Sequence, residues 1–211
     1  MREPQLPARA LLARNAAPKP VTPALLEAAA LAYLERFACS VASLRRVLVR
    51  KIDRSSVALA NEERGEHRAE ALAWVEALIE RYRNSGLIDD TRYARMRAAS
   101  LHRRGASARK IAVTLAQKGI DRDIIADSLG ERDEVQADAP RPGGDLAAAC
   151  AFVRRRRLGP CRAPEVRDTY RQRDLGSLAR AGFSRRIAEA TLGCDNLDEL
   201  FELEYSNMEN E

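Results

Sequence analysis

Two histidines and a pair of adjacent carboxylates are the residues with the clearest potential for catalysis. A histidine acts as a general base when a hydroxyl or thiol nucleophile stands at a characteristic spacing, and neither His67 nor His102 belongs to such a motif. Asp89 and Asp90 come where a helix is predicted to begin, so capping of that helix accounts for both of them. The sequence therefore predicts no catalytic site at these positions.

The cysteines and glycines do not form a recognisable metal or nucleotide motif either. Four cysteines lie far apart without C-x-x-C spacing, which argues against zinc: Cys39, Cys150, Cys161 and Cys194. No phosphate-binding glycine loop of either common type is present. We expect Cys39 and Cys150 to fill the core, because both stand among apolar residues. We expect a cytoplasmic, monomeric protein that is not an enzyme and has no cofactor.

Basic residues remain as candidates for binding a partner, because they gather in runs along the chain. They are Arg45, Arg46, Arg50, Lys51, Arg103, Arg104, Arg109, Lys110, Lys118, Arg154, Arg155, Arg156, Arg157, Arg162, Arg185 and Arg186. Such runs suit nucleic-acid phosphates or an acidic protein surface. The alternative is that bases near helix C-termini only balance the helix dipole. Few aromatic residues accompany them, so we do not expect bases of a nucleic acid to stack on an aromatic platform.

Composition points to a helical protein with a basic body. The 211 residues are 45% hydrophobic, mostly through alanine and leucine, but only 5% aromatic, which favours helix-on-helix packing over sheets. With 32% charged residues, no stretch is apolar for long enough to span a membrane. The net charge of +5 is uneven, because residues 196–211 contain acids and no base. Arginine far outnumbers lysine, so a compositional bias of the coding sequence is an alternative source of the positive charge.

Periodicity predicts a succession of short helices, with glycines and capping residues between them. A helix is predicted from Pro23, and another with Ser40 as its N-cap, followed by a polar interruption over 53–66 and a helix from His67 to Asn84. Gly86 should end that helix and Leu87 and Ile88 should enter the core. Later helices are predicted to begin after the caps Ser107 and Asp121, from Asp145, and near 165–181, each ending close to a glycine.

Two segments of the chain match each other without a gap. Residues 119–130 read GIDRDIIADSLG and residues 182–193 read GFSRRIAEATLG. A weaker match relates Leu44, Leu48 and Lys51-Ile52 to Ile111, Leu115 and Lys118-Gly119-Ile120. We interpret the chain as an all-α, elongated tandem array of three three-helix repeats. The expected divisions are a disordered lead-in 1–22, repeats 23–86, 87–130 and 145–193, a linker 131–144 and an acidic tail 194–211.

These motifs resemble the RecX family of bacterial recombinase regulators. The resemblance is carried by Gly86-Leu87-Ile88-Asp89-Asp90 followed by Tyr93 and Ala94, and by the turns at Gly119 and Gly182, and it spans roughly residues 24–193. It implies tandem three-helix repeats that bind the RecA filament on single-stranded DNA. It also implies inhibition of recombinase ATPase, strand exchange and coprotease activity, in homologous recombination, DNA repair and the SOS response.

The sequence also departs from the family pattern. Ser43 stands where an acidic residue is usual, and Lys51-Ile52 lacks the usual glycine. The alternative function is direct DNA binding by the helical units, although they lack a cluster of Asn, Gln and Arg for reading base edges. The acidic tail has two interpretations: a disordered solubilising segment, or a shield over the basic surface.

Overall fold

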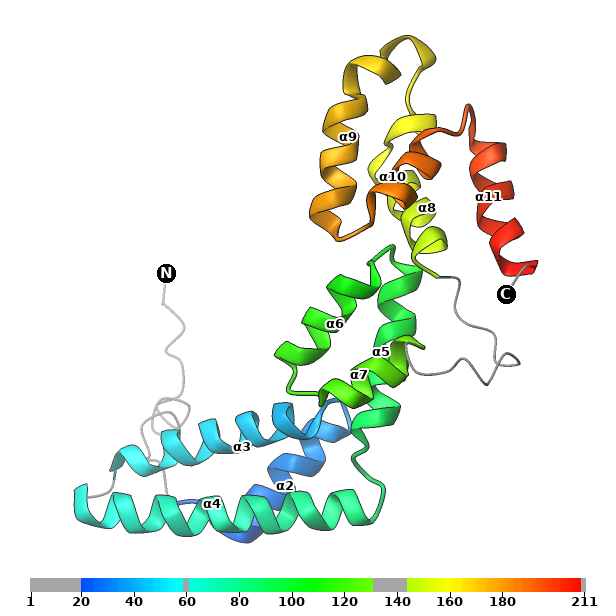
Figure 1. The fold of residues 1–211 in the computed structure, drawn as a ribbon. Coiled ribbons are helices and arrows are strands. Elements are labelled where there is room, and N and C mark those ends of the chain that lie inside the picture. Colours follow the sequence, from blue (N-terminus) through cyan, green and yellow to red (C-terminus); the bar gives the residue numbers. More distant parts are fainter. Residues whose placement is uncertain (1–19, 59–60, 131–143, 210–211) are drawn as a thin grey trace, which may run out of the picture. The chain divides into compact units, whose positions relative to one another are not determined.

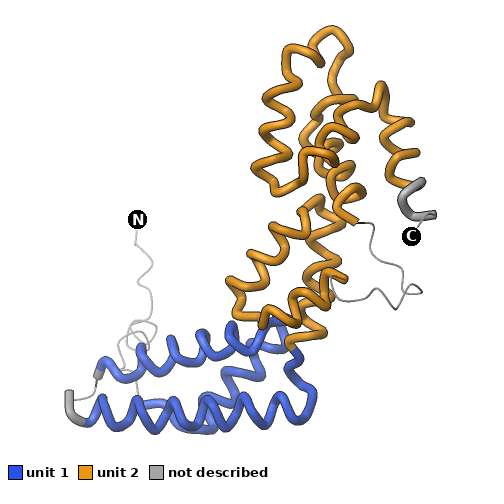
Figure 2. Tube along the Cα trace, viewed as in Figure 1, with its two compact units in different colours: residues 1–89 blue, residues 90–211 orange. Residues whose placement is uncertain are grey.

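A computed structural model describes residues 20–58, 61–130 and 144–209. Throughout these ranges the regular structure is helical and no strand occurs, which confirms the all-α prediction (Figure 1). The expected lead-in 1–22 and linker 131–144 fall almost wholly outside the described residues. None of the described helices is long and apolar enough to cross a membrane. The chain forms two compact units that divide between Asp89 and Asp90 (Figure 2).

The first unit packs three helices around one apolar cluster. They are α2 (Pro23–Leu34), α3 (Val41–Ser55) and α4 (Asn61–Asn84), with the short 3-10 turn η1 (Ser56–Ala58) after α3. Leu44, Leu48 and Ile52 recur every four residues and are fully buried, so α3 presents one apolar stripe to its neighbours. The Ser40 side chain caps α3 by accepting a hydrogen bond from the Ser43 N–H at 3.2 Å, as predicted.

Two predictions for this unit are wrong. The segment 53–66 is not an interruption, because α3 continues to Ser55 and α4 begins at Asn61. The first turn of α4 is polar, and a segment without apolar residues gives no periodic signal, although Glu62, Glu63 and Arg64 are good helix formers. Leu87 does not enter the core but is 50% exposed, whereas its neighbour Ile88 is buried as expected.

The second unit contains two apolar clusters. The first is built by α5 (Asp90–Arg103), α6 (Ala108–Gln117) and α7 (Arg122–Leu129), with Ile111 and Leu115 fully buried. The second is built by α8 (Asp145–Arg156), α9 (Arg167–Ala181), α10 (Arg185–Leu192) and α11 (Leu197–Glu209), with the 3-10 turns η2 (Gly159–Cys161) and η3 (Pro164–Val166). We call them the middle bundle and the C-terminal bundle. Three repeats of one bundle, arranged as an elongated array, stay a prediction, since the C-terminal bundle has a fourth helix.

Helices of the second unit are joined by a recurring three-residue connection, which we call the glycine turn. It occurs at 105–107, 119–121 and 182–184, and consists of a left-handed glycine, an apolar residue and a capping Ser or Asp. In each turn the apolar residue donates its N–H to the carbonyl of a leucine five residues earlier, at 3.0 to 3.2 Å. This is the Schellman arrangement, which satisfies a carbonyl at the helix end. The segment match at Gly119 and Gly182 therefore has a structural basis.

The acidic end of the chain forms helix α11 and belongs to the C-terminal bundle. Leu200 is fully buried in the apolar cluster and Leu203 packs against it. A helix can bury a stripe of leucines while its acids face solvent, so the acidic composition does not prevent folding. The interpretation of this tail as a disordered segment is therefore wrong for the described residues from Leu197 onward.

The middle and C-terminal bundles contact each other through polar and close-packed backbone groups. The Ser107 hydroxyl donates to the Ala181 carbonyl at 2.7 Å, and the Ala108 N–H donates to the Asp145 carboxylate at 2.6 Å. Gly105 is buried, and a Cβ built on it would lie 2.7 Å from the Phe152 backbone nitrogen. We call this contact the junction. Because it rests on backbone approach, side-chain rearrangement cannot relieve an added methyl group there.

We expect Gly105→Ala to destabilise the second unit by about 2–4 kcal/mol, through a left-handed alanine and a backbone clash at the junction. Gly130→Ala is the matched control, because Gly130 has a similar positive φ but no atom of the described residues lies within 4 Å of an added Cβ. We expect the control to cost only about 1 kcal/mol. Urea unfolding of the full chain measures both, and equal losses would show that the close approach contributes nothing.

Candidate functional site

The run Arg154–Arg157 does not form a single basic surface. Successive residues of a helix point about 100° apart, so four consecutive side chains must diverge. Arg154 is half-buried beside α11, whereas Arg155 reaches the middle bundle and donates to the Arg104 carbonyl. Arg156 is exposed beside Phe152, with its guanidinium carbon 5.9 Å from the ring centroid. Arg157 ends α8 in a left-handed conformation with φ 54°.

Arg154 is held by the acidic C-terminal helix. Its guanidinium forms two hydrogen bonds with the Glu204 carboxylate, at 2.5 and 3.2 Å. It also lies over the Phe201 ring, 4.8 Å from the centroid. The hydrogen bond with Glu204 raises the pKa of Arg154, so the residue stays fully charged. A carboxylate of the tail therefore occupies one predicted binding residue, which fits the shielding interpretation at this position.

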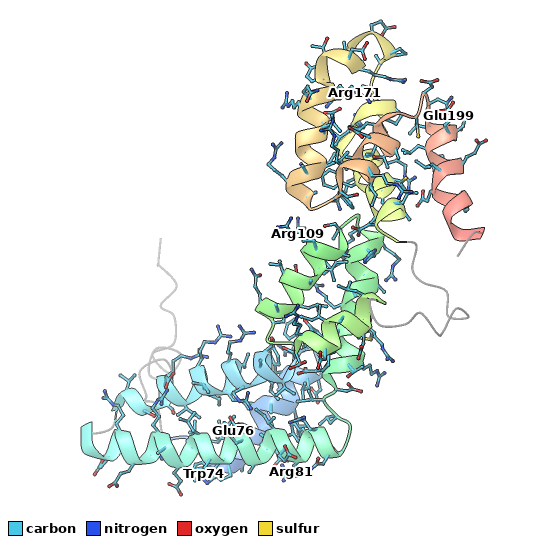
Figure 3. The ribbon with its side chains drawn as sticks, in the orientation of Figure 1. Trp74, Glu76, Arg81, Arg109, Arg171 and Glu199 are labelled. Atoms are coloured by element: carbon cyan, nitrogen blue, oxygen red, sulfur yellow. The ribbon has the colours of Figure 1, made fainter. Side chains whose placement is uncertain are left out.

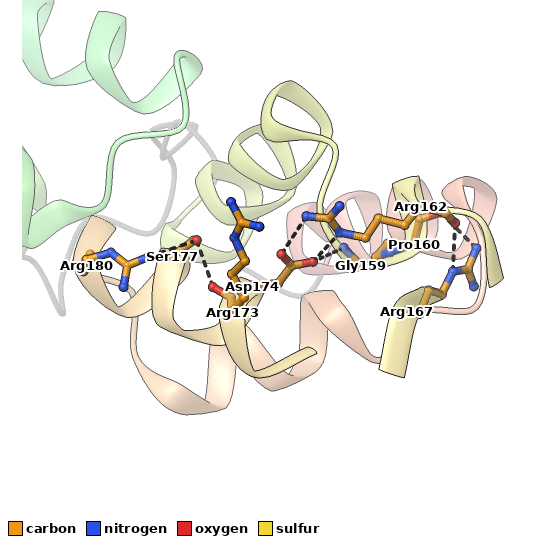
Figure 4. A network of polar contacts seen from close by, with 8 residues as sticks. All are labelled: Gly159, Pro160, Arg162, Arg167, Arg173, Asp174, Ser177 and Arg180. Carbon is orange, nitrogen blue, oxygen red and sulfur yellow. Dashed lines mark hydrogen bonds and ion pairs between the residues drawn. The ribbon is translucent and has the colours of Figure 1, made fainter. Parts of the chain in front are cut away.

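Arg162 is an internal residue of the fold. It forms a two-pronged ion pair with Asp174 of α9, with both contacts at 2.8 Å (Figure 4). Asp174 is 1% exposed, and its carboxylate also accepts the Gly159 N–H at 3.0 Å. Burial acts to raise the pKa of Asp174, but these hydrogen bonds outweigh it and lower the pKa below the usual 3.8. The prediction that Arg162 binds a partner does not fit this geometry, because its guanidinium is committed to Asp174.

Arg167 fixes the loop that follows α8. It donates to the Arg162 carbonyl at 3.0 Å and to the Pro160 carbonyl at 3.1 Å (Figure 4). A third bond goes to the Asp195 carbonyl, just before α11. Backbone carbonyls that no helix ladder satisfies thus find a charged donor. Arg162 and Arg167 show that part of the positive charge serves folding.

A basic pocket opens beside this network. Its volume is about 430 Å³, and its lining combines Lys110 of α6 with residues of α8 and α9 and with Leu158 and Arg162, which flank η2. The basic side chains along the wall are Lys110, Arg156, Arg162, Arg173 and Arg180. The first three are among the predicted binding residues, whereas Arg173 and Arg180 are not. A signal was present, since the two stand seven residues apart, which places them on one face of a helix.

A second basic feature lies on α3 in the first unit. Arg46, Arg50 and Arg54 are exposed and spaced four residues apart, so they form a row along one face of the helix. Each donates its Nε–H to the carbonyl four residues earlier, at distances of 3.1 to 3.3 Å. We call this the α3 arginine row. Arg54 was missed because the helix was predicted to end before it.

The other predicted binding residues are scattered. Arg45 pairs with Glu76 of α4 at 2.6 Å and Arg185 pairs with Glu189 at 2.7 Å, so both have carboxylate partners. Arg109 lies in the first turn of α6 (Figure 3). Exposed positions are also occupied by Arg103, Arg104, Arg109, Lys118 and Arg186, whereas Lys51 is half-buried. None of these residues lines the basic pocket.

The residues that could do chemistry do not form a catalytic arrangement in the described chain. The His67 ring meets Trp74 edge-on, with centroids 6.1 Å apart. Cys39 and Cys150 are buried, as predicted, and burial raises the pKa of Cys150 to about 12, which keeps it a thiol. Among the described residues, no group of three or more His, Cys, Asp or Glu side chains could hold a metal ion.

The motif residues of the resemblance stand at helix boundaries. Gly86 has φ 70° after α4, and α5 begins at Asp90, directly after Asp89. Tyr93 packs against the apolar cluster of the middle bundle. Gly119 and Gly182 begin two of the glycine turns, with φ of 78° and 94°. These residues therefore mark where helices end and begin, and this position accounts for their place in the motif.

Comparison with known proteins decides the family. Residues 89–129, which contain α5, α6 and α7, match the model for RecX, second three-helix domain. The chain is 43% identical to the regulatory protein RecX of Myxococcus xanthus over 176 residues, which cover 83% of this chain and 88% of that protein. The chain belongs to the RecX family. The predicted resemblance is thereby confirmed.

More distant RecX proteins match shorter parts of the chain. The regulatory protein RecX of Agrobacterium fabrum is 34% identical over 100 residues, covering 47% of this chain and 48% of that protein. That of Thermobifida fusca is 33% identical over 116 residues, covering 54% and 57%. No solved structure matches the chain. Family membership makes this protein a RecX-type regulator, while its basic residues have to be interpreted from its own geometry.

We expect Asp174→Asn to lower the free energy of unfolding by about 2–3 kcal/mol at pH 7, because Arg162 loses its charged partner. The folded-state pKa of Asp174 is lowered, so its contribution is present above the usual pKa and is lost as the pH falls below it. The difference between wild type and variant should therefore shrink from pH 7 to pH 3 in urea unfolding.

Asp168→Asn is the control for this experiment, since Asp168 lies exposed on the same helix without an ion pair among the described residues. It should leave the pH dependence unchanged. A constant difference between wild type and Asp174→Asn at all pH values would contradict the assignment.

Proposed function

We propose that this protein regulates a RecA-type recombinase by binding the filament that the recombinase forms on single-stranded DNA. Binding would inhibit ATP hydrolysis, strand exchange and coprotease activity. Membership of the RecX family supports the regulatory role. The observation that carries the proposal further is that each compact unit has its own set of exposed bases: the α3 arginine row in the first and the basic pocket in the second.

A filament offers many copies of the same surface, which suits a protein with separate basic sites. Attachment of one unit makes attachment of the other intramolecular, so two weak contacts give a strong combined affinity. A regulator that holds neighbouring subunits together opposes the movements that accompany ATP hydrolysis and filament disassembly. The exposed arginines would contact DNA phosphates or acidic recombinase side chains.

The α3 arginine row gives the sharpest test of this function. We expect the triple variant Arg46→Gln, Arg50→Gln, Arg54→Gln to need about tenfold more protein for half-inhibition of recombinase DNA-dependent ATP hydrolysis, the effect of losing ~1.4 kcal/mol over three surface contacts. The charge-matched control is Arg36→Gln, Arg83→Gln, Arg95→Gln, all exposed and outside the row. It should inhibit like the wild type.

Failure of the wild-type protein to inhibit ATP hydrolysis would contradict the proposed function. Equal losses in the two triple variants would show that net charge, and not the row, is responsible. Binding to bare single- or double-stranded DNA that is as tight as binding to the filament, and resistant to salt, would favour the alternative of a direct DNA-binding protein.

The shielding role of the tail is tested at Glu204. Removing residues 196–211 would also remove Leu200 from the core, so a point variant is cleaner. We expect Glu204→Gln to raise filament affinity about two- to fivefold by releasing Arg154 from an ion pair. Glu202→Gln is the control, since Glu202 is exposed on the same helix. Unchanged affinity of Glu204→Gln, measured by fluorescence anisotropy, would show that the ion pair is purely structural.

A further inference from the structure

The basic pocket of the second unit brings together cations from both of its bundles. Lys110 comes from α6 of the middle bundle, whereas Arg156 comes from α8 and Arg173 and Arg180 come from α9 of the C-terminal bundle. Ser177 of α9 also lines the pocket, and its hydroxyl donates to the Arg173 carbonyl at 2.9 Å. The cations of the wall therefore come from three helices of the second unit.

The positive charge of this pocket is not balanced within the described chain. Asp174 is the carboxylate in its lining, and both of its oxygens are engaged by Arg162 and the Gly159 N–H. The remaining lining cations, Lys110, Arg156, Arg173 and Arg180, have no ion pair with any described carboxylate. Like charges gathered around one cavity repel each other, so an anion that enters is attracted by all of them.

Balancing of helix dipoles does not explain the arrangement. Arg156 and Arg180 stand in the last turns of their helices, where a base is favourable. Lys110, however, lies in the first turn of α6, where the helix dipole disfavours a positive charge. Arg173 stands in the middle of α9, away from either end. Two of the four cations therefore occupy positions that the dipole does not favour.

The arginines are oriented by weak contacts that leave most of their donors available. Arg180 donates to the Ser177 hydroxyl at 3.3 Å (Figure 4). Arg173 lies with its guanidinium carbon 5.9 Å from the Tyr170 centroid. Arg156 is 5.9 Å from the Phe152 centroid. Arg162 and Arg167, in contrast, use several N–H groups on internal acceptors. Partial orientation with free donors is typical of a guanidinium that binds a ligand.

We propose that this pocket is a phosphate-binding site. Arginine forks match the spacing of phosphate oxygens, and a phosphate can accept from several donors at once, which a single carboxylate does less well. The volume of about 430 Å³ suits a phosphate with the sugar or second phosphate attached to it. The phosphate could come from the backbone of single-stranded nucleic acid or from a free nucleotide. For a nucleic-acid backbone the inference rests on the proposed function. For a free nucleotide it does not, because the binding experiment uses the protein alone.

A phosphate in this pocket also couples the two bundles. Lys110 and Arg180 would be drawn to one anion from opposite sides of the junction, close to the Ser107–Ala181 hydrogen bond, since Ala181 also lines the pocket. Binding would thus stabilise the folded second unit as a whole, by ordinary linkage.

The experiment titrates the full-length protein with inorganic pyrophosphate by isothermal calorimetry, with ionic strength held constant by chloride. The wild type should bind saturably. Arg173→Gln with Arg180→Gln should weaken binding at least about tenfold. The charge-matched control is Arg171→Gln with Arg186→Gln, two exposed arginines outside the pocket, one of them on the same helix α9. It should bind within about twofold of the wild type.

Competition identifies the source of the phosphate. A single-stranded oligonucleotide that displaces pyrophosphate from the wild type, and binds less well to Arg173→Gln/Arg180→Gln, indicates the nucleic-acid backbone. Displacement by ATP but not by the oligonucleotide indicates a free nucleotide. Absence of saturable pyrophosphate binding, equal losses in the control variant, or pyrophosphate that neither ligand displaces would each overturn the proposal.

Recombinase ATP hydrolysis, measured with the same variants, separates this site from the proposed function. If the wild-type protein inhibits ATP hydrolysis but does not bind pyrophosphate, the phosphate-binding proposal is wrong and the proposed regulatory function stands. If it binds pyrophosphate but does not inhibit, the regulatory function is wrong and the phosphate-binding proposal stands.

Discussion

In a bundle of short helices, the chain must end one helix and begin the next within a few residues. The packing of the second unit depends on how the chain makes these connections. The glycine turn reverses the chain in three residues, satisfies a carbonyl of the helix that ends, and caps the helix that begins. Its middle residue is buried at Ile120 and Phe183, so the turn also contributes to the core. A connection that is fixed locally in this way lets helices of eight residues pack stably, although isolated helices of that length are marginal.

Helix geometry also determines which groups the arginine side chains can contact. Because helices turn about 100° per residue, a run of bases in the sequence is distributed over several neighbours, as the run 154–157 shows. Bases that are separated in the sequence are brought together, as Lys110 and Arg173 are in the basic pocket. Charge density along the sequence is thus a poor guide to charge density on the surface. Spacing of four or seven residues is the better one, and it marks both the α3 arginine row and the pair Arg173 and Arg180.

Local signals in the sequence predict the helix ends well, because a cap or a left-handed glycine acts within a few residues. Ser40, Ser107 and Asp121 were assigned correctly for this reason. The polar start of α4 was missed because it has no apolar residues. Helix α11 was missed because its leucines stand among many acidic residues, and the acidic composition was interpreted as a tail. The Asp174–Arg162 pair could not be foreseen either, because the partners lie on different elements and their proximity depends on the loop after α8. The candidate site was predicted in part, through Lys110 and Arg156, and only the fold shows which bases share a cavity.

The hydroxyl of Ser107 takes part in two structures at once. It accepts the Lys110 N–H at the start of α6 and donates to the last carbonyl of α9, while a Cβ on Gly182 would lie 2.5 Å from it. The first turn of α6 and the last turn of α9 therefore depend on the same hydroxyl group. Melting of either end deprives the other of a hydrogen-bond partner, so the two bundles should open as one cooperative block. Glycine is thus required at position 182 for two reasons, the positive φ of its own turn and the Ser107 hydroxyl of the other bundle. A change at either residue would have to be matched by a compensating change in the other bundle.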